Sequence, residues 1–189
     1  MIRVLFVLIF IISHQSLNAK NDDWSSYGKD SGGGHYSEAN EITPENVKNL
    51  KKIWEHRSGD FHAGLNWTED VTPNSSQQTS FQATPILVND TLFYCTPYNR
   101  VFALDPETGE EKWVFDPKIE IEQKALLHCR GVGSWTDINK TENEECYHRI
   151  ITGTIDAELF AIDGKTGKLC SDFGAVSYTH LTLPTSRSV

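Results

Sequence analysis

The chain has four cysteines, Cys95, Cys129, Cys146 and Cys170, and their number and spacing restrict the chemistry that they can perform. No two of them form a Cys-x-x-Cys pair, which argues against a zinc site or a thioredoxin-like redox site. An even number of cysteines is typical of disulfide-bonded exported proteins. Cys129 and Cys146 flank a polar segment, residues 133–145, that we interpret as an insertion, so we predict a disulfide between them. Four cysteines allow three connectivities, and buried thiols are the alternative for the other two.

Other groups of polar residues give weaker signals for a site. His56 and His62 flank a glycine in a polar stretch, which is typical of an exposed loop and not of a metal site. Gly32, Gly33 and Gly34 are not framed by a strand and a helix, so they do not predict a phosphate-binding loop. The formal net charge of −9 argues against nucleic acid as a partner, because an acidic surface repels phosphate.

Two stretches of the chain repeat one pattern. Residues 101–113 read Val-Phe-Ala-Leu-Asp-Pro-Glu-Thr-Gly-Glu-Glu-Lys-Trp, and residues 159–168 read Leu-Phe-Ala-Ile-Asp-Gly-Lys-Thr-Gly-Lys. Each predicts a strand, an Asp-x-x-Thr-Gly turn in which glycine takes a positive φ, and a return strand. The second copy has Ser171 where the tryptophan would fall. Self-similar units are typical of propellers and solenoids, where each unit buries its apolar face against its neighbours.

The elements that must position these residues are strands, and the predicted class is all-β with one short helix. Thr43 is placed to cap that helix, with Pro44 at its first position and its end near residue 51. The polar residues 58–79 are typical of a long surface loop. Strands are predicted at 52–56, 86–88, 91–96, 101–104, 111–115, 149–153 and 158–162, with turns at 89–90 and 97–100.

Both ends of the chain differ from the part between them. Residues 1–19 combine Arg3, an apolar run and a small-residue end, which is the pattern of a secretory signal peptide; an uncleaved anchor is the alternative. Residues 176–185 match the peptide obtained by translating a transposase adapter used in sequencing libraries. We therefore interpret residues 176–189 as an adapter-derived artefact, with a genuine strand-forming tail as the alternative.

The pattern Ala-x-Asp-x-x-Thr-Gly-x-x-x-Trp resembles the tryptophan-docking repeat of the quinoprotein dehydrogenases, which are eight-bladed propellers that carry pyrroloquinoline quinone (PQQ). The residues that fill it are Ala103, Asp105, Thr108, Gly109 and Trp113. The segments that resemble quinoprotein glucose, quinate and polyol dehydrogenases in the same order are 24–28, 35–37, 42–47, 83–85, 90–97, 129–132 and 172–174. The resemblance implies that residues 20–175 form the first blades of an incomplete eight-bladed β-propeller.

The resemblance also implies which side chains contact the cofactor. PQQ is a flat tricarboxylate with an ortho-quinone, and arginine binds carboxylates through two parallel hydrogen bonds. Arg130 matches a cofactor-contacting arginine of the family, and Gln82 matches a position where relatives place Gln or Glu against the cofactor. Tyr98 stands where related glucose dehydrogenases commonly have histidine; a tyrosine there can still lie over a π-system and donate one hydrogen bond.

The resemblance further implies that the complete protein oxidises an alcohol group of a sugar, cyclitol or polyol in the periplasm or outside the cell, with association with a membrane as an alternative. The resemblance implies PQQ and Ca²⁺ as cofactors, an Asp base, and a quinone or a cytochrome as electron acceptor. In family order the base and the metal ligands follow Gly174, so no catalytic or metal-binding residue is expected in this chain, which should be inactive alone. The alternative is a non-catalytic propeller scaffold, because such scaffolds use the same repeat.

Overall fold

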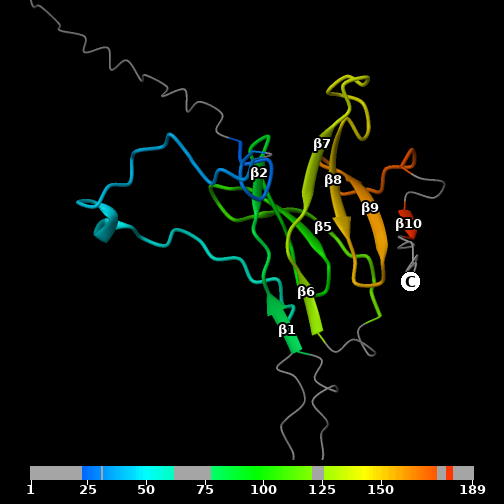
Figure 1. Cartoon of the computed structure of the whole chain (residues 1–189), viewed down its shortest axis with the longest axis horizontal. Coiled ribbons are helices and arrows are strands. Elements are labelled where there is room, and N and C mark those ends of the chain that lie inside the picture. The colour runs from blue at the N-terminus through cyan, green and yellow to red at the C-terminus, as the bar shows by residue number, and fades with distance from the viewer. Residues whose placement is uncertain (1–22, 31, 62–77, 121–125, 174–177, 181–189) are drawn as a thin grey trace, which may run out of the picture.

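The computed structural model describes residues 23–30, 32–61, 78–120, 126–173 and 178–180. These residues form two four-stranded antiparallel sheets and one parallel pair of strands (Figure 1). The first sheet has the order β2 (Ile86–Val88), β3 (Thr91–Cys95), β4 (Val101–Leu104) and β5 (Glu111–Phe115). The second has the order β10 (Tyr178–His180), β9 (Glu158–Asp163), β8 (His148–Gly153) and β7 (Gly133–Thr136). The parallel pair is β1 (Gln78–Phe81) and β6 (Leu126–Cys129).

The all-β prediction is therefore confirmed. Within the described ranges the single helical element is one 3-10 turn, η1 (Val47–Asn49). No helix among these residues has both the length and the apolar character needed to span a membrane. The predicted signal peptide lies outside the described residues.

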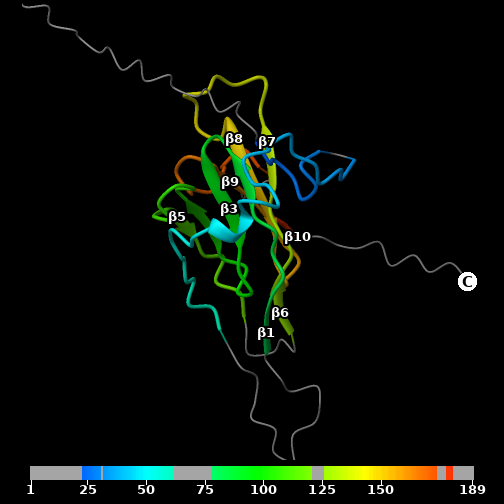
Figure 2. The same ribbon diagram turned by 90° about the vertical axis from the view of Figure 1, so that its left-hand side faces the viewer.

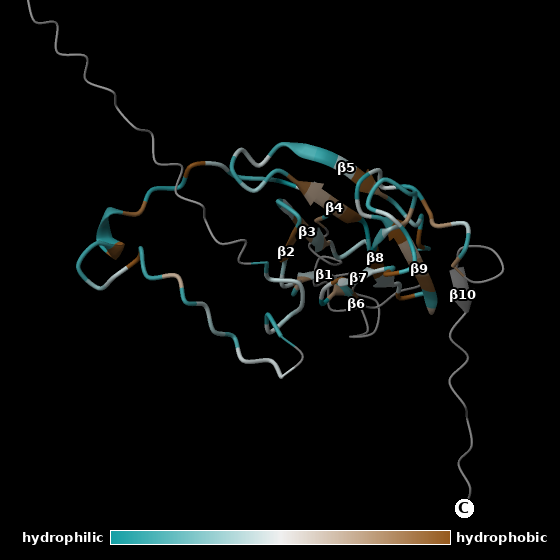
Figure 3. Cartoon of the chain, turned by 90° about the horizontal axis from the view of Figure 1, so that it is seen from above, coloured by the Kyte–Doolittle hydropathy of each residue, from teal (hydrophilic) through white to brown (hydrophobic). Residues whose placement is uncertain are grey.

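The hydrophobic core lies where the two sheets face each other. Every residue of β4 is buried, and hydrophobic residues also line β9 (Figure 3). Apolar side chains of both sheets share one cluster, which joins Phe93 and Val101 of the first sheet to Ile150 and Ile162 of the second. Each sheet therefore buries its apolar face against its neighbour, as the repeated sequence pattern predicts.

The repeated Asp-x-x-Thr-Gly sequence forms the same turn twice, and its side chains explain the motif. Oδ1 of Asp105 accepts hydrogen bonds from the Glu107 N–H, the Thr108 N–H and the Thr108 hydroxyl, at 2.9–3.1 Å. Asp163 does the same for Lys165 and Thr166 after β9. One carboxylate thus satisfies the donors that the turn would leave unpaired.

A tryptophan docks on each of these turns, and this contact explains the glycine in the motif. The Trp113 indole donates to the Gly164 carbonyl at 3.1 Å, and its ring covers Gly167. A Cβ added at Gly167 would lie only 2.8 Å from the Trp113 ring. The backbone φ of Gly167, 74°, also favours glycine. Trp54 makes the equivalent contact with the first turn, donating to the Pro106 carbonyl at 3.1 Å and covering Gly109.

The helix and the strand predicted before the first sheet differ from the structure. Of the predicted helix only residues 47–49 are helical, as the 3-10 turn η1, which Thr43 does not cap, and residues 52–56 do not form a strand. Asn46 Oδ1 instead accepts from the Thr43 N–H at 2.7 Å, so the local hydrogen bonds of this segment close a turn. No residue of η1 is buried, and a short helix without a packed face is not stable.

The N-terminal arm, residues 32–61, reaches out from the sheets (Figure 1) and is attached to them through His56. The His56 ring bonds the Tyr94 hydroxyl through Nδ1 at 2.5 Å and a Glu111 carboxylate oxygen through Nε2 at 2.7 Å. Burial, with the nearby Glu111 charge, raises the pKa of Tyr94 to about 12, so this hydroxyl keeps its proton. His56 is thus a structural residue; His62 lies outside the described residues.

The disulfides differ from the predicted Cys129–Cys146 bridge. Cys95 bonds Cys129 with their Cα atoms 5.9 Å apart, and Cys146 bonds Cys170 at 5.8 Å. The prediction failed because residues 133–136 are not part of an insertion: they form β7, which carries the chain away from the end of β6. Cys129 consequently belongs to the core between the sheets, whereas Cys146 packs in a separate cluster.

Peptide mapping without reduction should give two cross-linked pairs, one holding Cys95 and Cys129 and the other Cys146 and Cys170. Disulfides require Cα atoms within about 7 Å, and these two pairs meet that requirement in the fold. A cross-linked peptide that joins Cys129 to Cys146 would contradict this arrangement. Digestion after reduction is the control, since both cross-linked species should then disappear.

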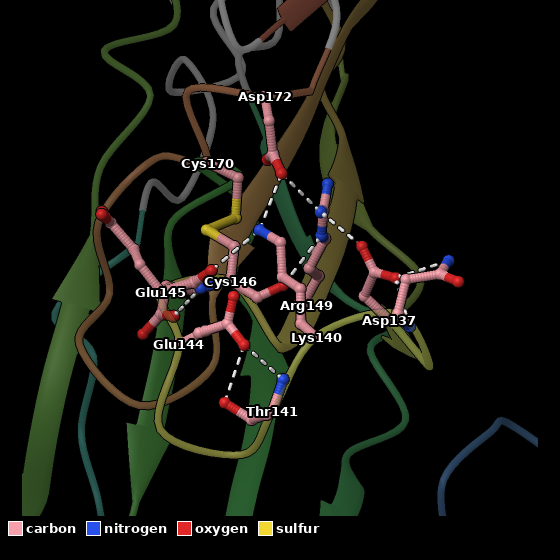
Figure 4. A network of polar contacts seen from close by, with 11 residues as sticks. Asp137, Lys140, Thr141, Glu144, Glu145, Cys146, Arg149, Cys170 and Asp172 are labelled. Carbon is pink, nitrogen blue, oxygen red and sulfur yellow. Dashed lines mark hydrogen bonds and ion pairs between the residues drawn. A yellow bond between two sulfur atoms is a disulfide. The ribbon is translucent and has the colours of Figure 1, made fainter.

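The Cys146–Cys170 disulfide lies beside a network of charged groups (Figure 4). Buried Arg149 donates to the carboxylates of Asp137 and Asp172 and to the Cys146 carbonyl. Lys140 adds an ion pair with Asp172 at 2.7 Å. The loop in the region of the predicted insertion is the hairpin loop between β7 and β8. The contacts of Arg149 and Lys140 attach this loop to the residues after β9.

The segment that we interpret as adapter-derived contributes β10. Tyr178, Thr179 and His180 pair with Phe160, Leu159 and Glu158 at the edge of β9. Any short extended peptide can satisfy the free N–H and C=O groups of a strand edge, so this pairing is compatible with either origin of the segment. The origin of residues 176–189 stays a prediction.

The segment 20–175, produced alone, should aggregate or fold poorly. Its arm exposes large apolar side chains, among them Ile53 at 79% and Phe61 at 77%, and its sheets leave edges to which other strands can pair. Light scattering and thermal denaturation followed by circular dichroism would test this. A sharp, reversible unfolding transition of a monomer would contradict it.

Candidate functional site

A cavity of about 280 Å³ lies between the two sheets at one end of their strands. The first wall of the cavity consists of residues 128–131, at the end of β6 and directly after it. The second wall consists of residues 153–155, at the end of β8 and the start of the turn that leads to β9. Asn99, from the turn between β3 and β4, lies in the lining with them. The cavity is therefore built from the ends of three elements that are far apart in the sequence.

The parallel pair of strands positions two of the predicted cofactor residues. β1 and β6 lie side by side in both views (Figure 1 and Figure 2), with Phe81 paired to Cys129. Gln82 and Arg130 are the next residues along, so they follow neighbouring strands in register. Just beyond, the Thr84 N–H donates to the Arg130 carbonyl at 3.1 Å and fixes the backbone there. The structure thus makes Gln82 and Arg130 neighbours along the backbone, but Gln82 is not among the residues that line the cavity.

The Arg130 side chain is exposed and lines the cavity. Its guanidinium has no hydrogen-bond or ion-pair partner among the residues that the structure describes. The Gln82 amide donates only to the neighbouring Ser80 hydroxyl, at 3.0 Å. A planar cation with five free donors beside a cavity can bind a carboxylate through two parallel hydrogen bonds.

Tyr98 lines a second hollow, distinct from the cavity beside Arg130. That hollow has a volume of about 370 Å³ and is lined by Asp60, Tyr98, Arg100, Asp116, Lys118 and Ile119. Arg100 is engaged there, because its guanidinium binds the Asp60 carboxylate and the Ser58 carbonyl. Burial acts to raise the pKa of Asp116, but the contacts with Lys118 outweigh it and lower that pKa. Tyr98 is therefore not among the residues that line the cavity beside Arg130.

Two lining residues were not singled out by sequence reasoning. Asn99 is fully buried, and its side chain contacts both walls of the cavity. Its one sequence signal is an asparagine in a predicted turn, because asparagine tolerates left-handed backbone better than most residues, and its φ is indeed 56°. His128 lines the cavity with a buried Nδ1 that has no hydrogen-bond partner among the described residues. No sequence signal distinguishes His128.

One group of side chains in the described part of the chain has the composition of a metal site, namely Cys146, Cys170 and Asp172. Both cysteines of this group are joined in a disulfide, so neither offers the thiolate that a metal ion binds. The Asp172 carboxylate is already paired with Lys140 and Arg149. This group is structural.

Sheets that pack face to face through docked tryptophans, with a cavity at one end of the strands, define a segment of a β-propeller. The PQQ family model, described as the glucose/ethanol/alcohol dehydrogenase β-propeller domain, matches residues 24–187. The chain belongs to this family of PQQ-dependent dehydrogenase propellers, and it comprises part of the propeller.

Individual relatives agree with this assignment. Quinoprotein glucose dehydrogenase A of Acinetobacter calcoaceticus is 36% identical over 165 residues, which cover 80% of this chain and 19% of that protein. Quinate/shikimate dehydrogenase (quinone) of Acinetobacter baylyi is 32% identical, with 82% of this chain and 20% of the relative covered. The chain thus spans about a fifth of the length of the curated relatives it matches.

A solved structure shows the same fold. Quinohemoprotein alcohol dehydrogenase from Comamonas testosteroni superposes with a TM-score of 0.58 at 24% identity. The match covers 86% of this chain and 20% of that protein. The two sheets therefore correspond to blades of a larger propeller.

Proposed function

We propose that this chain is the N-terminal part of an exported PQQ-dependent dehydrogenase that oxidises an alcohol group of a sugar, cyclitol or polyol. The observation that carries the proposal is the exposed, unpartnered Arg130 guanidinium beside the cavity of this family's fold. Relatives named as glucose, glycerol and quinate dehydrogenases support this substrate class. Relatives named for a quinone or for cytochrome c support either as the electron acceptor.

The residues present fit a flat, carboxylate-bearing cofactor. Arg130 would bind a carboxylate of PQQ, and the neighbouring Gln82 amide would hydrogen-bond an oxygen without adding like charge. His128 lines the same cavity, and its buried Nδ1 has no partner among the described residues and is available for a hydrogen bond. Tyr98 remains a candidate contact from the neighbouring hollow. PQQ, bound together with Ca²⁺, would supply the two-electron oxidant.

The cavity is small for a complete cofactor site. Its volume of about 280 Å³ lies at the lower limit of the roughly 300–1,000 Å³ typical of ligand pockets. We therefore propose that this chain forms one side of the site, and that the Ca²⁺ ligands and the catalytic Asp base belong to later blades. This chain alone should then be inactive.

Resequencing the gene from source DNA, without a transposase library, tests the boundaries of the proposal. We expect the reading frame to continue beyond Ala175 with further Asp-x-x-Thr-Gly repeats. We also propose that residues 1–19 are a signal peptide that directs the protein to the periplasm or outside the cell, which N-terminal sequencing of the exported protein would check. A frame that truly stops at Val189 would contradict the proposed dehydrogenase, because two blades cannot hold its chemistry.

Activity of the full-length protein tests the function itself. Apo-protein should bind PQQ in the presence of Ca²⁺ and then reduce an artificial dye with glucose, quinate or glycerol as substrate. The matched control omits PQQ. If saturating PQQ and Ca²⁺ give neither binding nor dye reduction with any polyol, the scaffold alternative replaces the enzyme.

A further inference from the structure

Asn99 lies at the centre of the cavity lining and is 1% exposed. It occupies the turn between β3 and β4, which the Thr96 and Arg100 backbones close with a hydrogen bond of 2.9 Å. Its φ of 56° is left-handed, a conformation that asparagine adopts more readily than most side chains. The turn therefore holds the Asn99 amide at one fixed place between the sheets.

This amide bonds both walls of the cavity at once. Its Nδ2 donates to the His128 carbonyl of the first wall at 3.1 Å. Its Oδ1 accepts from the Ile155 N–H of the second wall at 2.8 Å. Only a side chain with a donor and an acceptor about one amide width apart can make both bonds, so aspartate or serine cannot replace it.

The two walls are also joined outside the cavity, because β7 follows the first wall and pairs with β8, and Cys129 packs in one cluster with Ile150. Two further constraints act on the first wall alone. The Cys95–Cys129 disulfide and the Thr84–Arg130 hydrogen bond hold the first wall. The second wall belongs to the next sheet, where the Glu158 carbonyl closes its turn. Asn99 joins these two parts, and the His128 carbonyl that it binds lies two residues before Arg130.

We propose that Asn99 is a positioning residue of the cofactor site: it fixes the separation of the two walls and so presents Arg130 to a carboxylate of PQQ. The choice of PQQ as ligand rests on the proposed function. Asn99 acts through the backbone of its neighbours and needs no contact with the cofactor. Both of its polar groups are used by the walls.

Two variants of the full-length protein separate positioning from stability. Asn99→Gly keeps the left-handed backbone and removes both bonds, whereas Asn99→Asp keeps the acceptor for Ile155 and loses the donor to His128. Ile150→Val is the matched control, because Ile150 is fully buried in the core but does not line the cavity. Its expected stability loss is comparable to that of one lost hydrogen bond.

The Kd for PQQ should rise about tenfold in both Asn99 variants and remain unchanged in Ile150→Val. Because the defect lies in assembling the site, kcat measured at saturating PQQ should return to near the wild-type value. A Kd equal to that of the Ile150→Val protein would overturn the proposal, as would a kcat that saturating PQQ does not restore.

Hydrogen exchange gives a second measurement that does not depend on PQQ. In apo Asn99→Gly, amide exchange should accelerate in residues 128–131 and at Ile155, while β4 exchanges as in the wild type. Unchanged exchange at the two walls would overturn the positioning role even if PQQ binds. Conversely, faster exchange at both walls in a protein that never binds PQQ would uphold the role of Asn99 in the cavity and reject the proposed cofactor.

Discussion

Replacing Arg130 by alanine in the full-length protein should weaken PQQ binding by about 10- to 100-fold. A hydrogen bond to a charged group contributes about 1.5–3 kcal/mol, which corresponds to that range. The Arg130 guanidinium is available for such a bond because it has no partner among the described residues. Titration of apo-protein with PQQ, followed by quenching of tryptophan fluorescence, measures the change in Kd.

Two further variants make this result specific. Arg57→Ala removes an exposed arginine of the N-terminal arm whose partner is Glu55, so the Kd should not change. Arg130→Lys keeps the charge but loses the planar fork, and its Kd should fall between those of the wild type and Arg130→Ala. Equal Kd values for Arg57→Ala and Arg130→Ala would remove Arg130 from the site.

Replacing Trp113 by alanine should lower the free energy of unfolding by about 3 kcal/mol. This value is at the lower end for a Trp-to-Ala change because the side chain is only partly buried. The variant loses the ring packing on Gly167 and the hydrogen bond to the Gly164 carbonyl, both of which join the first blade to the second. Chemical denaturation followed by circular dichroism measures the loss.

Trp135 provides the matched control for this effect. It is 46% exposed on β7 and contacts the Arg149 guanidinium, so Trp135→Ala should cost about 1 kcal/mol or less. Gly167→Ala should be strongly destabilising in the wild type and less so in Trp113→Ala, because the clash with the indole ring is then removed while the cost of alanine at a φ of 74° remains. Equal losses for the two tryptophan variants, or additive losses for Trp113→Ala and Gly167→Ala, would contradict the docking role.

Local sequence signals predicted the parts of the fold that local interactions determine. The strand before each Asp-x-x-Thr-Gly turn and the return strand after the first turn were predicted to within about a residue, since Asp105 and Asp163 form their turns with neighbours in the sequence. The return strand predicted after the second turn is wrong, because only an isolated bridge between Ile162 and Leu169 forms there. The strand β7 was missed because Gly-Ser-Trp-Thr lacks an apolar alternation, and its pairing with β8 decides its conformation. The helix predicted at residues 43–51 is reduced to the 3-10 turn η1 for the opposite reason: its capping signal had no packed face to support it.

The candidate site could be predicted only in part. Family resemblance selected Gln82 and Arg130, and the parallel pairing of β1 with β6, which no local pattern reveals, places them in register. Asn99 was read as a turn residue, and its contacts with His128 and Ile155 arise only when the two sheets pack. The disulfide pairing failed for the same reason, because the polar segment between Cys129 and Cys146 suggested that these two pair, whereas packing selects Cys95 for Cys129.

The contact between Trp54 and the first turn has a consequence for the order in which the proposed full-length protein folds. Trp54 docks as Trp113 does, and Trp113 belongs to the outer strand of its sheet. The arm around Trp54 therefore occupies the place of an outer strand whose sheet must come from elsewhere in the ring. If that sheet is synthesised last, the arm can pack only after the rest of the chain has been made. Ring closure is then the slow step of folding, because contacts between residues so distant in sequence form slowly. Until then, the apolar side chains of the arm stay open to association with other chains.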